Sequence, residues 1–247
     1  MYELRRIRSV RATWIVSALY LASVVAFGAL PLYLGSHEVG SAFIQSWKGL
    51  YNTPANFFSV VLLSVIAAQS FGHEYRYGTI RLTLSEFPKR ERVLIAKTLV
   101  LAVYVVVMHF VAWSALGLVG KFAPSGSLNA GAEGFTFNGG APADLWKVLV
   151  YGLAYCLIAF SVAAITRNLA LGIVIPLVFA SVLEGLINGI STLVHDRLRW
   201  LVDILPISNG QSWLSASKEL PHAGLVFSIW VVGLLMIATF MFARRDA

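Results

Sequence analysis

Long apolar segments, separated by short polar ones, run through almost the whole chain. Several of them reach the roughly 20 residues that a helix needs to cross the hydrocarbon core of a membrane. They are apolar throughout rather than at alternate positions, which argues against a transmembrane β-barrel. We therefore expect an all-α polytopic membrane protein with six transmembrane helices. The predicted spans are residues 14–34, 55–71, 93–119, 144–165, 169–194 and 223–243.

Two segments outside these spans are expected to lie at the membrane surface. In residues 1–13, four arginines stand opposite apolar residues at helical spacing, which predicts an amphipathic interfacial helix. The alternative, the basic start of a signal peptide, fits less well because the next apolar segment is too long. Residues 195–222 are apolar but broken by prolines, so we expect short helices at the outer interface. Residues 72–92 form a charged connector between the second and third spans. We expect a single transmembrane domain over residues 1–247.

Composition and charge agree with this arrangement. Hydrophobic residues make up 58% of the chain and charged residues only 13%, too few to cover the surface of a water-soluble domain. With the N-terminus inside, thirteen of the 19 lysines and arginines fall in inner segments and six in outer ones. The positive-inside rule thus predicts that both termini and the connector lie in the cytoplasm. The net charge of +7 then faces lipid and partner proteins, so we expect no nucleic acid, and we expect a bacterial cytoplasmic membrane.

The connector with its flank, residues 72–97, carries six of the basic residues. Apolar residues at spacings of three and four predict a helix over residues 74–87 with one apolar stripe, ended by Pro88. The stripe consists of Tyr77, Ile80, Leu84 and Phe87. The charged side chains expected on the other faces are Glu74, Arg76 and Arg81. From charge alone, an ordinary cytoplasmic loop that anchors two spans is the simpler explanation.

One set of residues in this stretch resembles the signature of type-2 ABC transporter permeases, the transmembrane subunits of one class of ABC exporters. The matching residues are Glu74, Gly78, Thr79, Leu84, Pro88, Arg90 and Lys97. The six spans, the basic N-terminal helix and the short turn between the fourth and fifth spans fit the family's plan as well. The family often has an arginine three residues after the proline. Here Arg90 and Arg92 stand two and four residues after it, so we assign no particular salt bridge to either.

The resemblance implies that this chain is driven by another protein. The connector would contain a coupling helix that docks on an ATP-binding subunit, and two such subunits would serve two permease chains, identical or homologous. The coupling residues so implied are Glu74, Arg76, Gly78, Thr79, Arg81, Leu84, Pro88 and Arg90. ATP and magnesium would bind to the partner subunits, because this chain's Gly117, Gly120 and Lys121 lack the spacing of a P-loop. We therefore expect no enzymatic activity and no cofactor on this chain.

The fifth predicted span carries polar residues on one face. Glu184, Asn188, Ser191 and His195 recur at spacings of four, three and four, and two glycines beside them would allow close helix approach. An ionisable group within a span usually faces protein or a water-filled cavity. Glu184 therefore either lines a substrate path, with Asn188 and Ser191, or fixes the packing of the helices. The sequence favours neither interpretation.

Other classes of function have weaker support. His73-Glu74 has no second histidine at the spacing of a zinc protease, and no Gly-x-Ser-x-Gly sequence occurs, so we expect neither a metal site nor an intramembrane hydrolase. His109, in the third span, is expected to be a satisfied internal histidine. An ion-coupled secondary carrier would show internal repeats and several charges at the midplane. The sequence features described so far do not distinguish a subunit of a membrane-remodelling or immunity complex from an exporter. For an exporter, the apolar outer region favours an amphipathic substrate such as a drug, a peptide or a lipid-like molecule.

Overall fold

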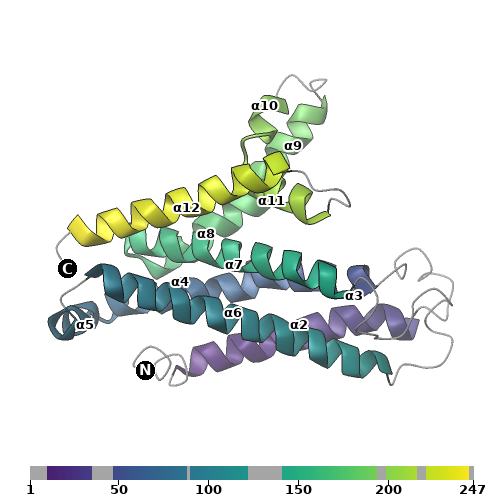
Figure 1. Cartoon of the computed structure of the whole chain (residues 1–247), viewed down its shortest axis with the longest axis horizontal. Coiled ribbons are helices and arrows are strands. Elements are labelled where there is room, and N and C mark those ends of the chain that lie inside the picture. Colours follow the sequence, from purple (N-terminus) through teal and green to yellow (C-terminus); the bar gives the residue numbers. More distant parts are fainter. Residues whose placement is uncertain are drawn as a thin grey trace. The chain divides into compact units, whose positions relative to one another are not determined.

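The computed structural model describes residues 10–34, 47–87, 90–121, 141–193, 199–215 and 221–244. In this part of the chain every regular element is a helix, and no strand is present (Figure 1). The prediction of an all-α protein is confirmed. The elements are α2 (Arg11–Leu34), α3 (Trp47–Phe58), the π-helical turn η1 (Ser59–Leu63), α4 (Ser64–Arg76), α5 (Ile80–Glu86), α6 (Arg90–Lys121), α7 (Ala141–Thr166), α8 (Leu169–Val178), the π-helical turn η2 (Phe179–Leu183), α9 (Glu184–Leu193), α10 (Arg199–Val202), α11 (Pro206–Ser215) and α12 (Pro221–Arg244).

Among the described residues, five helices are long and apolar enough to cross a membrane. They are Arg11–Leu30, Pro54–Arg76, Arg90–Val119, Leu145–Thr166 and His222–Arg244, and they match the first four predicted spans and the last. The predicted fifth span, residues 169–194, is built from α8, η2 and α9, of which α8 is a shorter apolar helix of 10 residues. The chain is thus a membrane protein with several apolar helices, and a sixth span stays a prediction.

Several predicted boundaries change. The second long helix begins at Trp47, eight residues before the expected start at 55, because α3, η1 and α4 follow one another without a gap. Between the fifth and last predicted spans, the expected short helices are present as α10 and α11. The interfacial helix predicted over residues 1–13 falls almost wholly outside the described residues.

The described residues group into two compact units, which are treated separately. Unit 1 comprises Met1–Leu63 and Val100–Leu153, and unit 2 comprises Ser64–Leu99 and Ala154–Ala247. In unit 1, α2 packs on α3 and η1. Its core consists largely of buried aromatic and aliphatic side chains, among them Tyr20, Val24, Leu63, Val105 and Tyr151.

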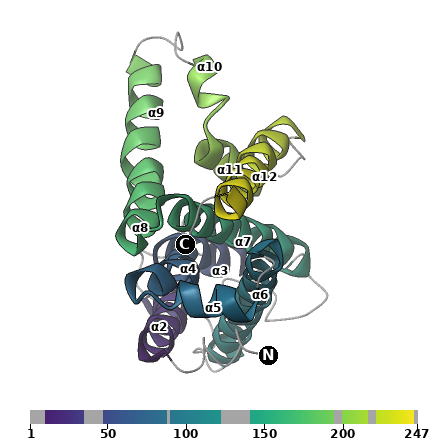
Figure 2. The same ribbon diagram turned by 90° about the vertical axis from the view of Figure 1, so that its left-hand side faces the viewer.

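The core of unit 2 is centred on Phe71 of α4. Its ring centroid lies 5.5 Å from that of Phe160 in α7 and 5.2 Å from that of Phe242 in α12, both in edge-to-face contact. Figure 2 shows α9 continuing from α8, and the chain returning through α10 and α11, which packs on α12. Aromatic rings thus join three helices that are far apart in the sequence.

Two glycines bring α8 close to its neighbours in unit 2. A Cβ atom on Gly72 of α4 would lie 2.7 Å from the Cα atom of Leu169, and one on Gly172 would lie 2.5 Å from the Cβ atom of Ala163 in α7. Both distances are far below van der Waals contact, so only glycine permits this approach. Small residues at helix crossings are typical of membrane proteins, in which close packing replaces the hydrophobic effect between helices.

The outer faces of the long helices are also apolar. Phe27, Val103, Val107, Ile229 and Val232 are among the large hydrophobic side chains that stay more than half, or close to half, exposed on them. A helix that is apolar all round suits a membrane or the core of a large protein. This pattern agrees with a multi-pass location in the lipid bilayer.

Candidate functional site

The charged connector is divided by a turn and does not form the single helix predicted over residues 74–87. Helix α4 ends at Arg76, and α5 begins at Ile80. Between them Gly78 has a φ of +67°, a left-handed conformation that glycine adopts without strain and that commonly ends a helix. The single helix was predicted from the spacing of apolar residues alone. Gly78 was the local sequence signal that the helix ends there.

The predicted apolar stripe is only partly buried, because Tyr77 lies before the turn and not on α5. Ile80 and Thr83 are buried, whereas Tyr77 and Phe87 are exposed. The most exposed apolar side chain of α5 is Leu82, with an exposed fraction of 71%. Thr83 donates both its backbone N–H and its hydroxyl to the carbonyl of Thr79, at 3.1 and 3.3 Å, so it needs no partner outside this turn. One narrow face of α5 is anchored in unit 2, and the other faces are open.

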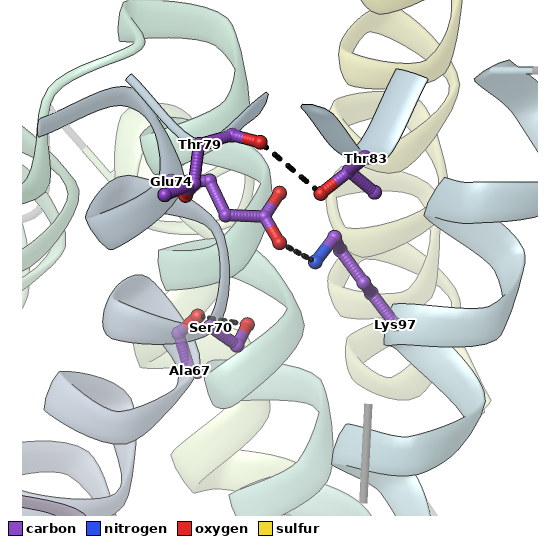
Figure 3. Close-up of polar contacts among 6 residues, drawn as sticks. All are labelled: Ala67, Ser70, Glu74, Thr79, Thr83 and Lys97. Carbon is purple, nitrogen blue, oxygen red and sulfur yellow. Dashed lines mark hydrogen bonds and ion pairs between the residues drawn. The ribbon is translucent and has the colours of Figure 1, made fainter. Parts of the chain in front are cut away.

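Beneath the connector, Glu74 of α4 forms a buried ion pair with Lys97 of α6 (Figure 3). The Nζ atom of Lys97 donates to Oε1 of Glu74 at 2.7 Å, and each residue is only 2% exposed. We had expected Glu74 to project away from the protein with the other charges, and this expectation is wrong. A carboxylate and an ammonium taken out of water need each other, because the loss of hydration is offset only by close and well-oriented contact. The pair therefore holds the end of α4 to the start of α6.

The other residues implied in coupling divide into two groups. Arg76, Gly78, Thr79 and Arg81 are exposed, and Leu84 is half-buried. Arg90 is half-buried and its Nη1 donates to the carbonyl of Phe242 at 3.4 Å, which ties α6 to α12. Pro88 lies outside the described residues. The structure therefore brings Glu74 together with Lys97, ties Arg90 to α12, and exposes the side chains of Arg76 and Arg81.

Replacing Gly78 with valine is expected to lower the free energy of unfolding by about 1–2 kcal/mol, because a Cβ atom disfavours the left-handed backbone. Open space surrounds the position, so no clash adds to this cost. The Gly78→Asn variant should lose less free energy of unfolding, because asparagine adopts this conformation more readily. Unfolding of the purified protein in mixed micelles measures these values. The matched control is Gly233→Ala in α12, which also faces open space but has an ordinary helical backbone. Equal losses for valine and asparagine would contradict the backbone explanation.

Glu184, the ionisable residue of the predicted fifth span, caps another helix. Its Oε1 accepts from the N–H of Ile207 at 3.0 Å, and its Oε2 accepts from the N–H and the hydroxyl of Ser208 at 2.5 and 2.6 Å. Pro206, the first residue of α11, has no N–H to offer, so Glu184 takes the first two backbone donors of that helix. A carboxylate is favoured there by the helix dipole as well. This geometry supports the packing interpretation of Glu184.

The neighbours of Glu184 complete the same contact. Asn188 donates from Nδ2 to the carbonyl of Glu184 and to the hydroxyl of Ser208, both at 2.9 Å. Ser191 is buried, and His195 lies outside the described residues. The two glycines of this helix, Gly185 and Gly189, face open space, so the close approach expected at them is wrong for contacts within this chain.

Unit 1 contains a buried polar cluster around His109 of α6. Its Nδ1 donates to the carbonyl of Val105 at 2.9 Å, which leaves Nε2 as the acceptor, 3.0 Å from the hydroxyl of Ser59 in η1. The hydroxyl of Tyr51 donates to the carbonyl of His109 at 3.0 Å. Burial, with Tyr20 nearby, raises the pKa of Tyr51 above its ordinary value, so it stays a neutral donor. His109 is thus a satisfied internal histidine, as expected.

The five long apolar helices among the described residues define a multi-pass membrane protein. A family model described as ABC-2 family transporter protein matches residues 2–184, about three quarters of the sequence, and the chain belongs to this family. Permeases of the family work with ATP-binding subunits. No individual curated protein matches the chain. The match confirms the resemblance to the ABC permeases that the connector indicated.

Proposed function

We propose that the chain is the transmembrane subunit of an ATP-driven exporter that moves an amphipathic substrate such as a drug, a peptide or a lipid-like molecule. Two ATP-binding subunits would bind the ATP and magnesium, and a second permease chain, identical or homologous, would complete the complex. The positive-inside distribution of lysine and arginine supports a bacterial cytoplasmic membrane with both termini in the cytoplasm. Membership of the ABC-2 family supports the division between a permease and separate ATPase subunits.

The proposal includes six spans. Helices α8, η2 and α9 together run from Leu169 to Leu193 without a gap, a length of 25 residues. That is long enough to cross the hydrocarbon core, for which about 20 residues are needed. The π-helical turn within it begins at Phe179, three residues after Pro176. Local widening of this kind restores backbone hydrogen bonds near a proline and allows the helix to bend.

The observation that carries the proposal is the exposure of apolar side chains on the connector. Leu82 and Tyr77 are exposed by 71% and 67% and lie among the charged residues that separate two spans. In a segment rich in charge, exposed leucine and aromatic side chains suit contact with another protein, whose interfaces are enriched in aromatic residues. Helix α5 is therefore the proposed coupling helix, and its docking partner is the ATP-binding subunit.

The mechanical step follows from the way α5 is held. Its buried residues Ile80 and Thr83 fix it to unit 2, and the Glu74–Lys97 ion pair joins the two helices on either side of it. A displacement of α5 by the ATPase would therefore move the end of α4 and the start of α6 together. A connector held only by flexible loops would absorb the same displacement.

Replacing Leu82 with aspartate is expected to reduce co-purification of the ATP-binding subunit by about tenfold or more, as for the loss of a central interface anchor. Leu82→Met, which keeps an apolar side chain of similar size, is the matched control and should retain the subunit. The measurement is the amount of P-loop ATPase that co-purifies with the tagged permease from its native cells. If wild-type permease brings down no ATPase, an ion-coupled carrier becomes the better explanation.

A further inference from the structure

In unit 2, a cavity of about 480 Å³ lies between the end of α4 and the start of α8, beside the turn that follows α7. Its polar end is formed by Arg76, the last residue of α4, and by Arg167 and Asn168 in the turn between α7 and α8. Its apolar side is formed by Gly72 on α4 and by residues of α8 such as Ile173. No acidic residue is among those that line it.

Both guanidinium groups at the polar end lie against aromatic rings. The guanidinium carbon of Arg167 lies 5.3 Å from the ring centroid of Tyr75, and that of Arg76 lies 5.8 Å from the ring centroid of Tyr77. Such cation–π contacts orient the guanidinium groups and keep their positive charge at this end of the cavity. Asn168 is neutral and its side chain caps α8, so the charge among the lining residues comes from Arg76 and Arg167.

The position of the cavity suggests what kind of anion it takes. Arg76 ends one candidate span, and Arg167 directly follows another, which ends at Thr166. Both arginines therefore lie at the level where hydrocarbon gives way to headgroups. Beside the cavity, α8 exposes further apolar side chains, among them Leu171, Val174 and Ile175. A ligand with a phosphate at one end and hydrocarbon at the other fits the polar end and the apolar side of the cavity. An acidic side chain of a soluble protein would leave the apolar side uncovered.

We infer that this cavity binds the headgroup of an anionic phospholipid, with the phosphate between Arg76 and Arg167 and an acyl chain along α8. Basic pockets between transmembrane helices are known to hold such headgroups. Bound there, the lipid bridges the end of α4, from which the connector starts, and the turn between α7 and α8.

Native mass spectrometry of the full-length protein tests the inference, with phosphatidylglycerol or phosphatidylcholine added to the detergent-solubilised sample. We expect phosphatidylglycerol to be retained in preference to phosphatidylcholine. Arg167→Gly should weaken its retention by about fivefold, the value of one arginine at a membrane surface. This variant should fold, because Arg167 has a φ of +54° and glycine relieves that conformation. Ala170→Phe, which fills the cavity and keeps both charges, should weaken retention too.

The control is Arg92→Gln, which removes an exposed positive charge of α6 outside the cavity lining and should leave lipid retention unchanged. Equal retention of the two lipids, or an equal loss in the control, would show only general surface charge and would overturn the inference. Displacement of the lipid by excess inorganic phosphate would assign the site to a soluble anion instead. If Arg167→Gly released the ATPase subunit while lipid retention stayed intact, the cavity would be a protein contact.

Discussion

Replacing Lys97 with methionine is expected to lower the free energy of unfolding by about 3–5 kcal/mol, the usual cost of removing one partner of a buried ion pair. The substitution keeps the apolar stem but takes the ammonium away from the carboxylate of Glu74, which lies 2.7 Å from it in a place that water does not reach. Unfolding in mixed micelles gives the free energy, and the amount of folded protein recovered from membranes gives an independent readout.

A double-mutant cycle separates the ion pair from its surroundings. The variant Glu74→Gln/Lys97→Met removes both charges and should recover a large part of the stability lost by either single variant, because no unpaired charge stays buried. The control Glu91→Gln removes an exposed carboxylate from the same helix and should change the free energy by less than about 0.5 kcal/mol. Losses that simply add in the double variant would show that Glu74 and Lys97 do not act as a pair.

The same variants test coupling. If the pair transmits the movement of α5, the stability-restored double variant should still hydrolyse ATP in the assembled complex but transport less per ATP consumed. The structure places both side chains out of reach of a docking partner, so binding of the ATPase subunit should be retained. Normal transport per ATP would restrict the pair to a role in stability.

Replacing Glu184 with leucine is expected to lower the free energy of unfolding by about 3 kcal/mol. The reason is that the N–H groups of Ile207 and Ser208 and the hydroxyl of Ser208 lose their acceptor. Glu184→Gln keeps an oxygen acceptor but loses the charge, so its effect should be smaller. Hydrogen exchange of the first amides of α11 is the most direct measurement, since these amides should exchange faster in both variants and fastest with leucine.

The control for this series is Ser212→Ala, also in α11, whose hydroxyl donates to the carbonyl of Ser208 one turn earlier. It should leave hydrogen exchange at the start of the helix unchanged. If Glu184→Gln instead altered which substrates are exported, while the amides of α11 stayed protected from hydrogen exchange, Glu184 would line the substrate path. The packing interpretation would then be wrong.

Five of the six spans were predictable because a run of apolar residues of sufficient length has few alternatives in water or in lipid. The connector was predictable only in part. The class of its partner, an ATP-binding subunit, was inferred from the motif. The prediction of the apolar stripe was only partly correct, because Gly78 changes the direction of the chain. Periodicity assumes an uninterrupted helix, and a single left-handed residue shifts the face of every residue after it.

The contacts of the buried charges were less accessible to sequence reasoning. Glu74 and Lys97 both belong to the motif, yet their spacing of 23 residues says nothing about contact until α4 and α6 are placed side by side. The partners of Glu184 include the backbone N–H groups of Ile207 and Ser208, which every non-proline residue possesses. Only the proline at position 206, which marks the start of a helix, was a usable signal.

The buried ion pair of α4 and α6 also has a consequence for biosynthesis. A charged side chain that is buried near the end of a membrane-spanning helix loses its hydration, and this loss is unfavourable until a partner of opposite charge is in contact. Glu74 is synthesised before Lys97, so its charge meets no ammonium until the next apolar helix has emerged from the ribosome. Entry of the two helices as a hairpin neutralises both charges at once.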